Sequence, residues 1–455
     1  MSADWPEFQL SEKCTIKSST RIFKKEYVET GVPFMRSKDV IDKALGVFSH
    51  FELFISKERF QEIKNKYGFP KKGDLLISSV GNRSGWPYIV QDEGDFYFKD
   101  GNVIWMSEFD DLDPDFLAYW MKSDIGQSAL ASIMIGSAQK AITIDSLRKL
   151  WVRFPPFEYQ QRSSDILKLL DKQIAGNKAT NQTLEQIAQA IFKSWFVDFD
   201  PVKAKIETLA QGGSADDAEL AAMRVISAKT VDELNSLKAS NPEAFNKLAQ
   251  TAALFPAAMQ DSELGEIPEG WDNGTIEDVM QFSSERVDVS GLNLRNYIST
   301  ENMLENKRGI TTASSLPSVS SVPAFNENEI LISNIRPYFK KIWLTEFKGG
   351  RSPDVLGFSL LDPEETEFAY NLLYQDRFFE YMMTTSKGAK MPRGDKSAIK
   401  QFSFPLPQKE LRLVFSKHVR PFYPMIKNTN KESEHLHALR DALLPELLSG
   451  NLGRS

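Results

Sequence analysis

Side chains that can hydrogen-bond the edges of nucleic-acid bases gather in two pairs of short segments of the chain. An arginine side chain is suited to guanine, and an asparagine or glutamine side chain is suited to adenine. Lysines beside them are suited to phosphates, which position a protein on DNA without specifying a sequence. The candidate base-reading residues are Asn82, Arg83 and Gln139 in the first pair and Asn334, Arg336, Lys390 and Arg393 in the second. The candidate phosphate contacts are Lys71, Lys72, Lys340 and Lys341, and Lys140, Tyr338 and Lys396 complete the predicted set. The alternative for each residue is a loop side chain that contacts only solvent.

The motifs of nucleic-acid enzymes are missing from the sequence. The Asn/Asp-Pro-Pro-aromatic signature of adenine methylation is absent. The segment from Gly388 to Ser397 comes nearest to a phosphate-binding loop. Its Asp395, however, separates the last glycine from the lysine and places a carboxylate where a phosphate would bind. Neither Pro114-Asp115 nor Pro353-Asp354 is followed by a nuclease partner motif at the required spacing.

No metal site is expected either. His435 and His437 are two residues apart on a predicted helix and therefore point to different faces, whereas a metal needs a pair four residues apart. A serine–histidine–aspartate arrangement stays open, because its members need not be adjacent in sequence.

Length and composition indicate a multidomain globular protein. The chain has 455 residues, of which 41% are hydrophobic and 26% charged, and one domain usually takes about 100–200 residues. The single cysteine, Cys14, excludes an intramolecular disulfide and favours a reducing compartment. The sequence shows neither a secretory signal nor an apolar stretch long enough to cross a bilayer. We therefore expect a soluble, cytoplasmic protein.

The negative net charge is concentrated in one segment. Residues 198–269 contain 13 acidic and 6 basic residues. Their net charge is therefore -7, which equals the net charge of the whole chain. Basic residues outnumber acidic ones by 14 to 7 over residues 13–72, and by five to one over both 334–351 and 387–400. Such segments can neutralise phosphates, although basic stretches of this size are also common on solvated surfaces.

The sequence repeats itself at an offset of 250 to 255 residues, with four elements in the same order. An apolar strand ending in serine recurs, followed by an aromatic helix, a glycine-containing basic loop and a proline-rich strand exit. The four pairs are Lys72–Ser78 with Asn328–Ser333, Asp113–Trp120 with Asp362–Tyr370, Gly136–Lys140 with Gly388–Met391, and Val152–Phe157 with Phe402–Pro407. An ordered series of four matches indicates a duplication.

A long helix with heptad spacing is predicted after each copy of the repeat. The seam residues are Ile166, Leu170, Leu184, Ile187 and Ile191 in the first helix, and Ile426, Leu436, Leu439 and Leu443 in the second. Each seam has a polar middle, with Gln173, Asn177 and Thr180 in one helix and Thr429 and Ser433 in the other. We expect the two helices to pair with each other; the alternative is that each packs only on its own domain. Pro421 and Pro424 are expected to break the first turns of the second helix.

The segment between the copies is acidic and rich in alanine. Helix starts at Ser214, Thr230 and Asn241, with a break at Gly212-Gly213, predict two or three short helices between Pro201 and Ser262.

In combination, these features resemble the specificity subunit of type I restriction-modification enzymes. The resemblance rests on the duplicated strand, the Gly-Ser-Ala-Gln-Lys loop, the Phe-Pro-Pro-Phe-Glu-Tyr-Gln-Gln exit and the Leu-Gly-Glu-Ile-Pro-Glu-Gly-Trp entry. It implies a noncatalytic DNA-binding subunit of a host-defence complex, with two target-recognition domains that each read one half of a bipartite DNA site. Long antiparallel helices would hold these domains apart and dock two modification methyltransferase subunits. The partners would be double-stranded DNA, those two subunits and the restriction/translocase subunits. No cofactor is expected in this chain; S-adenosylmethionine would bind the methyltransferase, and ATP with Mg would bind the restriction subunit.

The expected fold class is α+β, with two mixed recognition domains, long antiparallel coiled-coil helices and a pseudo-twofold internal repeat. The expected order is a recognition domain (1–157), a spacer helix (158–200), the acidic helical insert (201–262), a second recognition domain (263–407) and a second spacer helix (408–455). Two other readings stay open. One is a self-sufficient nuclease or methyltransferase, and the other is a coiled-coil scaffold without a nucleic-acid role.

Overall fold

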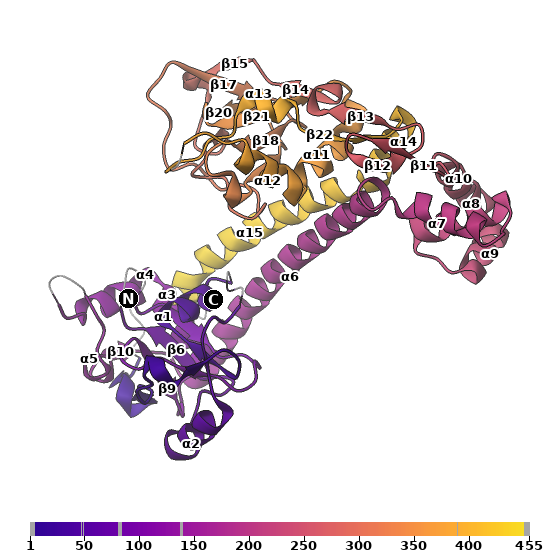
Figure 1. Ribbon diagram of the computed structural model, residues 1–455. Coiled ribbons are helices and arrows are strands. Elements are labelled where there is room, and N and C mark those ends of the chain that lie inside the picture. Colours follow the sequence, from indigo (N-terminus) through magenta and orange to yellow (C-terminus); the bar gives the residue numbers. More distant parts are fainter. Residues whose placement is uncertain are drawn as a thin grey trace. The chain divides into compact units, whose positions relative to one another are not determined.

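The chain folds into two compact units (Figure 1). The computed structural model describes residues 5–46, 48, 50–80, 84–136, 140–388 and 390–449. One unit contains Met1–Asn177 with Lys431–Ser455, and the other contains Lys178–Asn430. Both divisions fall inside long helices, α6 (Phe157–Phe196) and α15 (Phe422–Ser449). Each unit therefore holds one copy of the repeat and a part of both helices.

A four-stranded antiparallel sheet forms the centre of each copy, with the strands in the same order. The order is β2-β9-β6-β7 in the first copy and β14-β21-β18-β19 in the second. The bounds are Thr15–Lys17 (β2), Val103–Ser107 (β9), Leu75–Ser78 (β6), Pro87–Ile89 (β7), Met280–Phe282 (β14), Val355–Leu360 (β21), Ile330–Ser333 (β18) and Ile342–Leu344 (β19). Every residue of β6 and β18 is buried, which explains their continuous apolar sequences.

Two smaller sheets complete each copy. A two-stranded sheet pairs β1 (Glu7–Gln9) with β10 (Trp151–Arg153), and its counterpart pairs β13 (Asp272–Thr275) with β22 (Ser403–Leu406). The other sheet is ordered β3-β5-β4-β8 in the first copy and β15-β17-β20-β16 in the second. Its strands are Tyr27–Val28 (β3), Phe54–Ile55 (β5), Val32–Met35 (β4), Tyr97–Phe98 (β8), Arg286–Asp288 (β15), Ser321–Phe325 (β17), Gly349–Arg351 (β20) and Tyr297–Ile298 (β16).

The helices of the two copies also correspond. Besides α1 (Ser37–Ala44) and α2 (Lys57–Tyr67), the first copy has α3 (Pro114–Lys122), α4 (Asp124–Ser132) and α5 (Ile144–Arg148). The second has α11 (Thr366–Tyr374), α12 (Asp376–Thr384) and α13 (Lys396–Lys400). Equivalent contacts join them to the segment that follows each copy, which is α6 in the first copy and the junction between α14 and α15 in the second. Lys168 Nζ donates to Asp115 at 2.9 Å, and Arg420 Nε donates to Glu367 at 2.9 Å, both pairs shifted by 252 residues. The internal repeat is confirmed.

Antiparallel contacts between α6 and α15 occur within each unit. In the first unit, Asn177 Nδ2 lies 3.3 Å from Ser433 Oγ, and Arg440 Nη1 donates to Asp171 at 2.9 Å. In the second unit, Asn181 Nδ2 donates to Asn430 Oδ1 at 2.7 Å. The predicted pairing of the two helices is therefore confirmed in each unit.

Three apolar residues of the predicted seam are exposed instead, as are Gln173 and Thr180 of its polar middle. Ile166, Ile187 and Leu439 keep 43%, 41% and 48% of their surface accessible. Their neighbours Leu167, Ala188 and Arg440 take the contact positions. The predicted stripe favoured apolar side chains at a strict heptad period, whereas a helix repeats every 3.6 residues and the real seam accepts small and polar side chains. Leu170, Leu184, Ile191, Ile426, Leu436 and Leu443 are half-buried, in agreement with the prediction.

The second spacer is two helices and not one continuous helix over 408–455. Helix α14 (Lys409–Val419) ends before Arg420 and Pro421, and α15 begins at Phe422. Pro421 cannot donate the backbone hydrogen bond that would continue α14, while Pro424 is accommodated in the first turn of α15. Leu411, Phe415 and Val419 of α14 are fully buried in the core of the second unit.

The acidic insert contains four helices where two or three were expected. They are α7 (Asp200–Ala210), α8 (Ala215–Ser227), α9 (Val231–Ser240) and α10 (Pro242–Ala253). Ser214, Thr230 and Asn241 cap α8, α9 and α10, as their sequences predict. The missed helix, α7, begins at Asp200-Pro201, where proline suits the first turn. A hairpin of β11 (Met259–Ser262) and β12 (Gly265–Pro268) then leads into the second copy.

Candidate nucleic-acid interface

Backbone hydrogen bonds join the two predicted DNA-contacting segments of the second copy into one surface. The first follows β18, where Ser333 Oγ donates to the carbonyl of Ile335 at 3.2 Å. Ile335 forms an antiparallel bridge with Arg393, which in turn bridges Lys387. The Arg336 amide donates to the Pro392 carbonyl at 2.8 Å. Residues about 55 positions apart in sequence thus form a single loop pair.

The first copy has the same loop pair at the end of β6. Ser78 Oγ donates to the carbonyl of Val80 at 2.9 Å. Val80 bridges Ala141, and Ala141 bridges Ile135. Asn82, Arg83 and Gln139 lie outside the described residues, and the neighbouring Lys140 is exposed. The copies therefore share a loop scaffold but differ in the side chain at its centre, which is Ala141 in one and Arg393 in the other.

Four predicted contacts of the second copy are exposed. Three lie on the loop pair, Tyr338, Lys390 and Arg393, and Lys396 is the first residue of α13. Tyr338 keeps 48% of its surface accessible. Arg393 approaches Asp354, with Nη2 3.2 Å from Oδ1, and 55% of its side chain is accessible. Arg336 is half-buried, and its Nε has no hydrogen-bond partner among the described residues.

Asn334 differs from the expectation of a base-reading side chain, because only 8% of its surface is accessible. The backbone amide of Asn334 donates to the backbone carbonyl of Asp354 at 2.8 Å, and its backbone carbonyl accepts from the Gly394 amide at 3.2 Å. A Cβ on Gly394 would lie 2.6 Å from Asn334 Oδ1, so a larger residue at this position would have to displace the Asn334 side chain. Asn334 joins the two loops and lies beneath the exposed residues.

The predicted phosphate-contacting lysines do not occupy equivalent places in the two copies. Lys71 and Lys72 are exposed but precede β6, at the end of the strand opposite to the loop pair. Lys340 and Lys341 follow β18 and belong to its loop. Lys341 Nζ donates to the Thr300 carbonyl at 2.7 Å, and burial lowers the pKa of its ammonium group. Lys340 is paired with Asp376, with 3.0 Å between Nζ and Oδ2.

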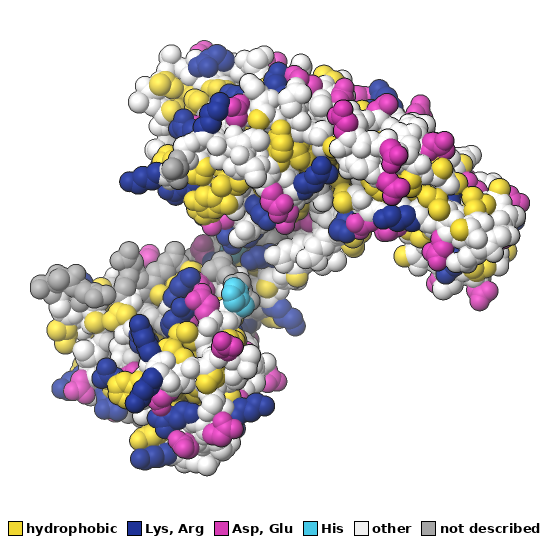
Figure 2. All heavy atoms as spheres, viewed as in Figure 1, with side chains coloured by type: hydrophobic (Ala, Val, Ile, Leu, Met, Phe, Trp, Pro, Cys, Tyr) yellow, Lys and Arg dark blue, Asp and Glu magenta, His cyan; other side chains and the backbone are white. Residues whose placement is uncertain are grey.

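Acidic side chains accompany the basic ones over the visible face of each unit, which shows Lys and Arg interspersed with Asp and Glu (Figure 2). Lys387 pairs with Asp395, and Lys400 pairs with Glu277 at 2.8 Å. Sequence reasoning missed Asp354, Asp376 and Lys307 as members of this surface, because each lies far along the chain from its partner.

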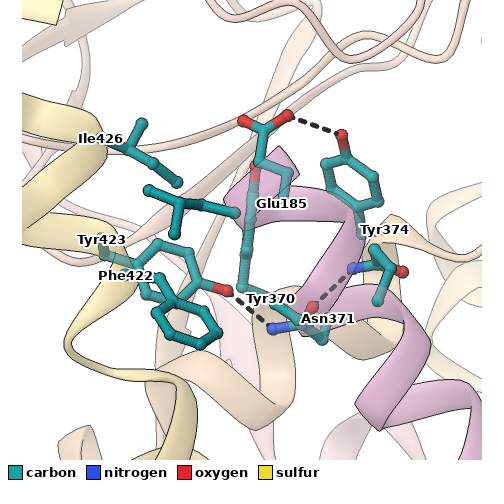
Figure 3. A pocket seen from close by; sticks show the side chains of 10 residues that line it. Glu185, Tyr370, Asn371, Tyr374, Phe422, Tyr423 and Ile426 are labelled. Carbon is teal, nitrogen blue, oxygen red and sulfur yellow. Dashed lines mark hydrogen bonds between the residues drawn. The ribbon is translucent and has the colours of Figure 1, made fainter. Parts of the chain in front are cut away.

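Where α6 packs against α11, a buried polar network surrounds a small cavity (Figure 3). The Tyr374 hydroxyl donates to Glu185 Oε2 at 3.3 Å, and Asn371 Nδ2 donates to the Tyr423 hydroxyl at 2.7 Å. Burial raises the pKa of Glu185 to about 7, although the hydrogen bond from Tyr374 and the charge of Lys307 oppose the rise.

Within the described parts of the chain, no group of three or more His, Cys, Asp or Glu side chains is placed to hold a metal ion. No helix among those same residues is long and apolar enough to cross a membrane.

Comparisons with known proteins agree on one family. Residues 2–186 match the family model of the type I restriction modification DNA specificity domain. The HindI specificity subunit of Haemophilus influenzae is 30% identical over 475 residues, covering 99% of this chain and 100% of that protein. The MjaIX specificity subunit of Methanocaldococcus jannaschii is 25% identical, covering 95% of this chain and 89% of that protein.

A solved structure shares the fold. The crystal structure of the type I restriction-modification system S subunit from M. genitalium has a TM-score of 0.53 and 15% identity, and it covers 98% of this chain and 96% of that one. Together with the full-length match to the HindI subunit, these findings establish that this chain belongs to the family of type I restriction enzyme specificity subunits.

Proposed function

We propose that this chain is the noncatalytic DNA-binding subunit of a type I restriction-modification complex and that each copy of its repeat reads one half of a bipartite target. The observation that carries this proposal is the loop pair present in both copies, Val80–Ala141–Ile135 and Ile335–Arg393–Lys387. A shared scaffold with different exposed side chains suits two half-sites of different sequence. Protein symmetry generally mirrors the symmetry of the DNA site.

Arg393 is the best-placed base-reading residue of the second copy. It is exposed, and bridges to Ile335 and Lys387 fix its backbone. In the assembled methyltransferase, Arg393→Ala should weaken binding to the target by about 1–3 kcal/mol, the range for one lost bidentate contact. Methylome sequencing should show relaxed specificity in one half-site only. The control is Lys238→Ala in α9 of the insert, another exposed basic residue. If Arg393→Ala and Arg336→Ala both left the affinity and the methylated sequence unchanged, this assignment would be wrong.

Exposed apolar side chains on the long helices support docking of the two modification methyltransferase subunits. Leu169 is 67% exposed and Met425 is 50% exposed, in addition to Ile166, Ile187 and Leu439. Ile166 and Leu169 are three residues apart and therefore neighbours on one face of α6, and a contiguous exposed apolar surface is typical of protein interfaces. Leu169→Asp should prevent co-purification of the methyltransferase subunit, while Gln161→Asp, at an exposed polar position of the same helix, should not. Equal recovery of the complex with both variants would remove Leu169 from the interface.

Catalysis and cofactors are assigned to the partners. S-adenosylmethionine would bind the methyltransferase subunits, and ATP with Mg would bind the restriction/translocase subunits. The purified chain, incubated with DNA and labelled S-adenosylmethionine, should transfer no methyl groups. Adding the methyltransferase subunits should produce both methylation and high-affinity specific binding. Methyl transfer by the verified-pure chain would refute a noncatalytic role.

A further inference from the structure

The Asp376 carboxylate, at the start of α12, lies between two lysines that come from two different loops. Its Oδ1 is 2.7 Å from Lys307 Nζ, and its Oδ2 is 3.0 Å from Lys340 Nζ. Partial burial raises the pKa of Asp376, but hydrogen bonds from both ammonium groups outweigh this and keep the pKa below its usual range. One carboxylate therefore joins both loops to the helix.

The two loops also pair through their backbones. The Asn306 amide donates to the Phe339 carbonyl at 2.8 Å, and the Lys307 amide donates to the Lys340 carbonyl at 2.9 Å. Four residues of this pair have left-handed backbones without being glycine: Asn306, Lys307, Arg336 and Lys340, with φ between 49° and 60°. Such conformations persist only where surrounding contacts enforce them, and they cluster at functional sites.

Lys307 is held inside the domain and not extended toward solvent. Only 15% of its side chain is accessible. Its Nζ lies 4.5 Å from the ring centre of Tyr374 and 5.8 Å from that of Phe379. An ammonium group in this position depends on a counter-ion, because an unpaired buried charge is strongly unfavourable. Asp376 supplies that counter-ion.

We propose that Asp376 is a positioning residue for DNA recognition by the loop over 334–341. It holds the left-handed turns that present Arg336 and Tyr338, and it keeps Lys307 and Lys340 from binding phosphates without regard to sequence. The proposal rests on the proposed function of this loop pair. It goes beyond a purely structural role, because loss of the carboxylate both loosens the loop and releases two cations.

The conformational part is tested without DNA, by hydrogen exchange of the full chain assembled with its methyltransferase subunits. In Asp376→Asn, the amides of Asn306 and Lys307 should exchange at least about tenfold faster than in the wild type. Asp376→Glu, which keeps the charge, should restore much of the protection. Glu380→Gln, at an exposed position of the same helix, is the matched control and should exchange like the wild type. If Asp376→Asn does not fold, Lys340→Gln, which leaves the Lys307 pair intact, should still speed exchange at the Lys307 amide.

The recognition part is tested by binding to target and unrelated DNA over a series of salt concentrations. Asp376→Asn should bind unrelated DNA several-fold more tightly. In a plot of log K against the logarithm of the salt concentration, the slope for this variant should be steeper by about one to two, because up to two further phosphates are neutralised. The ratio of target to unrelated affinity should fall by about tenfold, a decrease that a lower melting temperature alone would not produce.

The two experiments separate the possible failures. Unchanged exchange at Asn306 and Lys307 in Asp376→Asn would overturn the positioning role whatever the DNA result. Faster exchange with an unchanged affinity ratio and salt dependence would overturn the link to recognition. If Arg336→Ala and Arg393→Ala also left the affinity and the methylated sequence unchanged in that case, the proposed function of the loop pair would be wrong.

Discussion

Asn181 of α6 and Asn430 of α15 meet side chain to side chain. Asn181 Nδ2 donates to Asn430 Oδ1 at 2.7 Å, and the Thr429 hydroxyl donates to Asn181 Oδ1. Asn181 is 8% exposed, so its amide is satisfied by the partner helix and not by water. A polar residue at a helix seam lowers stability relative to leucine but fixes the register of the pair.

Asn181→Ala should therefore destabilise the second unit. The exposed Asn430 amide and the Thr429 hydroxyl, which also contacts the Met425 and Ile426 carbonyls, would lose their hydrogen bonds to Asn181, which costs about 1 kcal/mol. Chemical denaturation followed by circular dichroism measures this loss in the free energy of unfolding. The control is Thr183→Ala on the same helix, where the exposed hydroxyl bonds only the carbonyl of Ala179. Equal losses in the two variants would show that the Asn181–Asn430 contact contributes nothing specific.

Glu185 should make the stability of the second unit depend on pH. Burial raises its pKa to about 7 in the folded chain (Figure 3), so the folded state favours the neutral carboxyl. The unfolded chain ionises at its ordinary pKa near 4.5. The contribution to stability is therefore fully present below about pH 4.5, is lost as the pH rises to about 7, and stays lost above it. A rise of about 2.5 pKa units corresponds to a loss on the order of 3 kcal/mol.

Glu185→Gln should remove this pH dependence, because an amide cannot ionise. Its oxygen can still accept the hydrogen bond from the Tyr374 hydroxyl. Its free energy of unfolding should exceed that of the wild type at pH 8, and the two should converge near pH 5. Denaturant titrations between pH 5 and 8.5 measure both. Glu410→Gln, at an exposed position of α14, should run parallel to the wild type. A wild type whose stability does not fall between pH 5 and 7 relative to Glu185→Gln would contradict the assignment.

The repeated framework could be predicted from the sequence because its elements carry strong local signals. The buried strands β6 and β18 are short apolar runs, and the caps of α8, α9 and α10 follow from Ser214, Thr230 and Asn241. The helix seam was predicted only in part. Asn181 and Ala188 are buried in the seam, but a search for large apolar side chains at heptad spacing does not select them.

The proposed recognition surface was less predictable, because its geometry depends on contacts between distant segments. Nothing near Asn334 in the sequence indicates that Gly394 covers it, and nothing near Lys340 indicates that Asp376 holds it. Composition places basic residues in these loops, but only the tertiary structure determines which of them remain exposed and unpaired with a carboxylate.

Lys205 should be the main polar anchor of the acidic insert. Its side chain is 3% exposed, and Nζ contacts Glu219 Oε1 at 2.5 Å and the Phe255 carbonyl at 2.8 Å. Lys205→Met should lower the free energy of unfolding by about 1–3 kcal/mol, because the buried Phe255 carbonyl loses its partner, whereas the Glu219 carboxylate is 40% accessible and can be solvated. Limited proteolysis should then cleave within 200–255 first. Lys203→Met, at an exposed position of the same helix, should be neutral. Faster cleavage elsewhere, with the insert still protected, would contradict this prediction.

The last prediction concerns the distance between the two half-sites. Helix α6 is uninterrupted over 40 residues, and both units end within the polar middle of the helix pair, at Asn177 and Asn430. A continuous helix transmits a change in its length, whereas a flexible linker does not. Four residues added after Asn177 lengthen α6 by about 6 Å and nearly preserve its phase. Because Asn177 and Asn181 contact α15, four residues should also be added after Asn430 to keep both pairs in register.

Methylome sequencing of a host that carries the lengthened enzyme is the measurement. About 6 Å corresponds to nearly two base pairs at 3.4 Å each, so both half-site sequences should persist with a gap wider by one or two base pairs. Adding four residues after Gly212, between α7 and α8 in the insert, is the control and should leave the gap unchanged. An enzyme with lengthened helices that still methylates the original spacing would show that the helices do not set the distance. So would one that loses a half-site sequence while the gap stays the same.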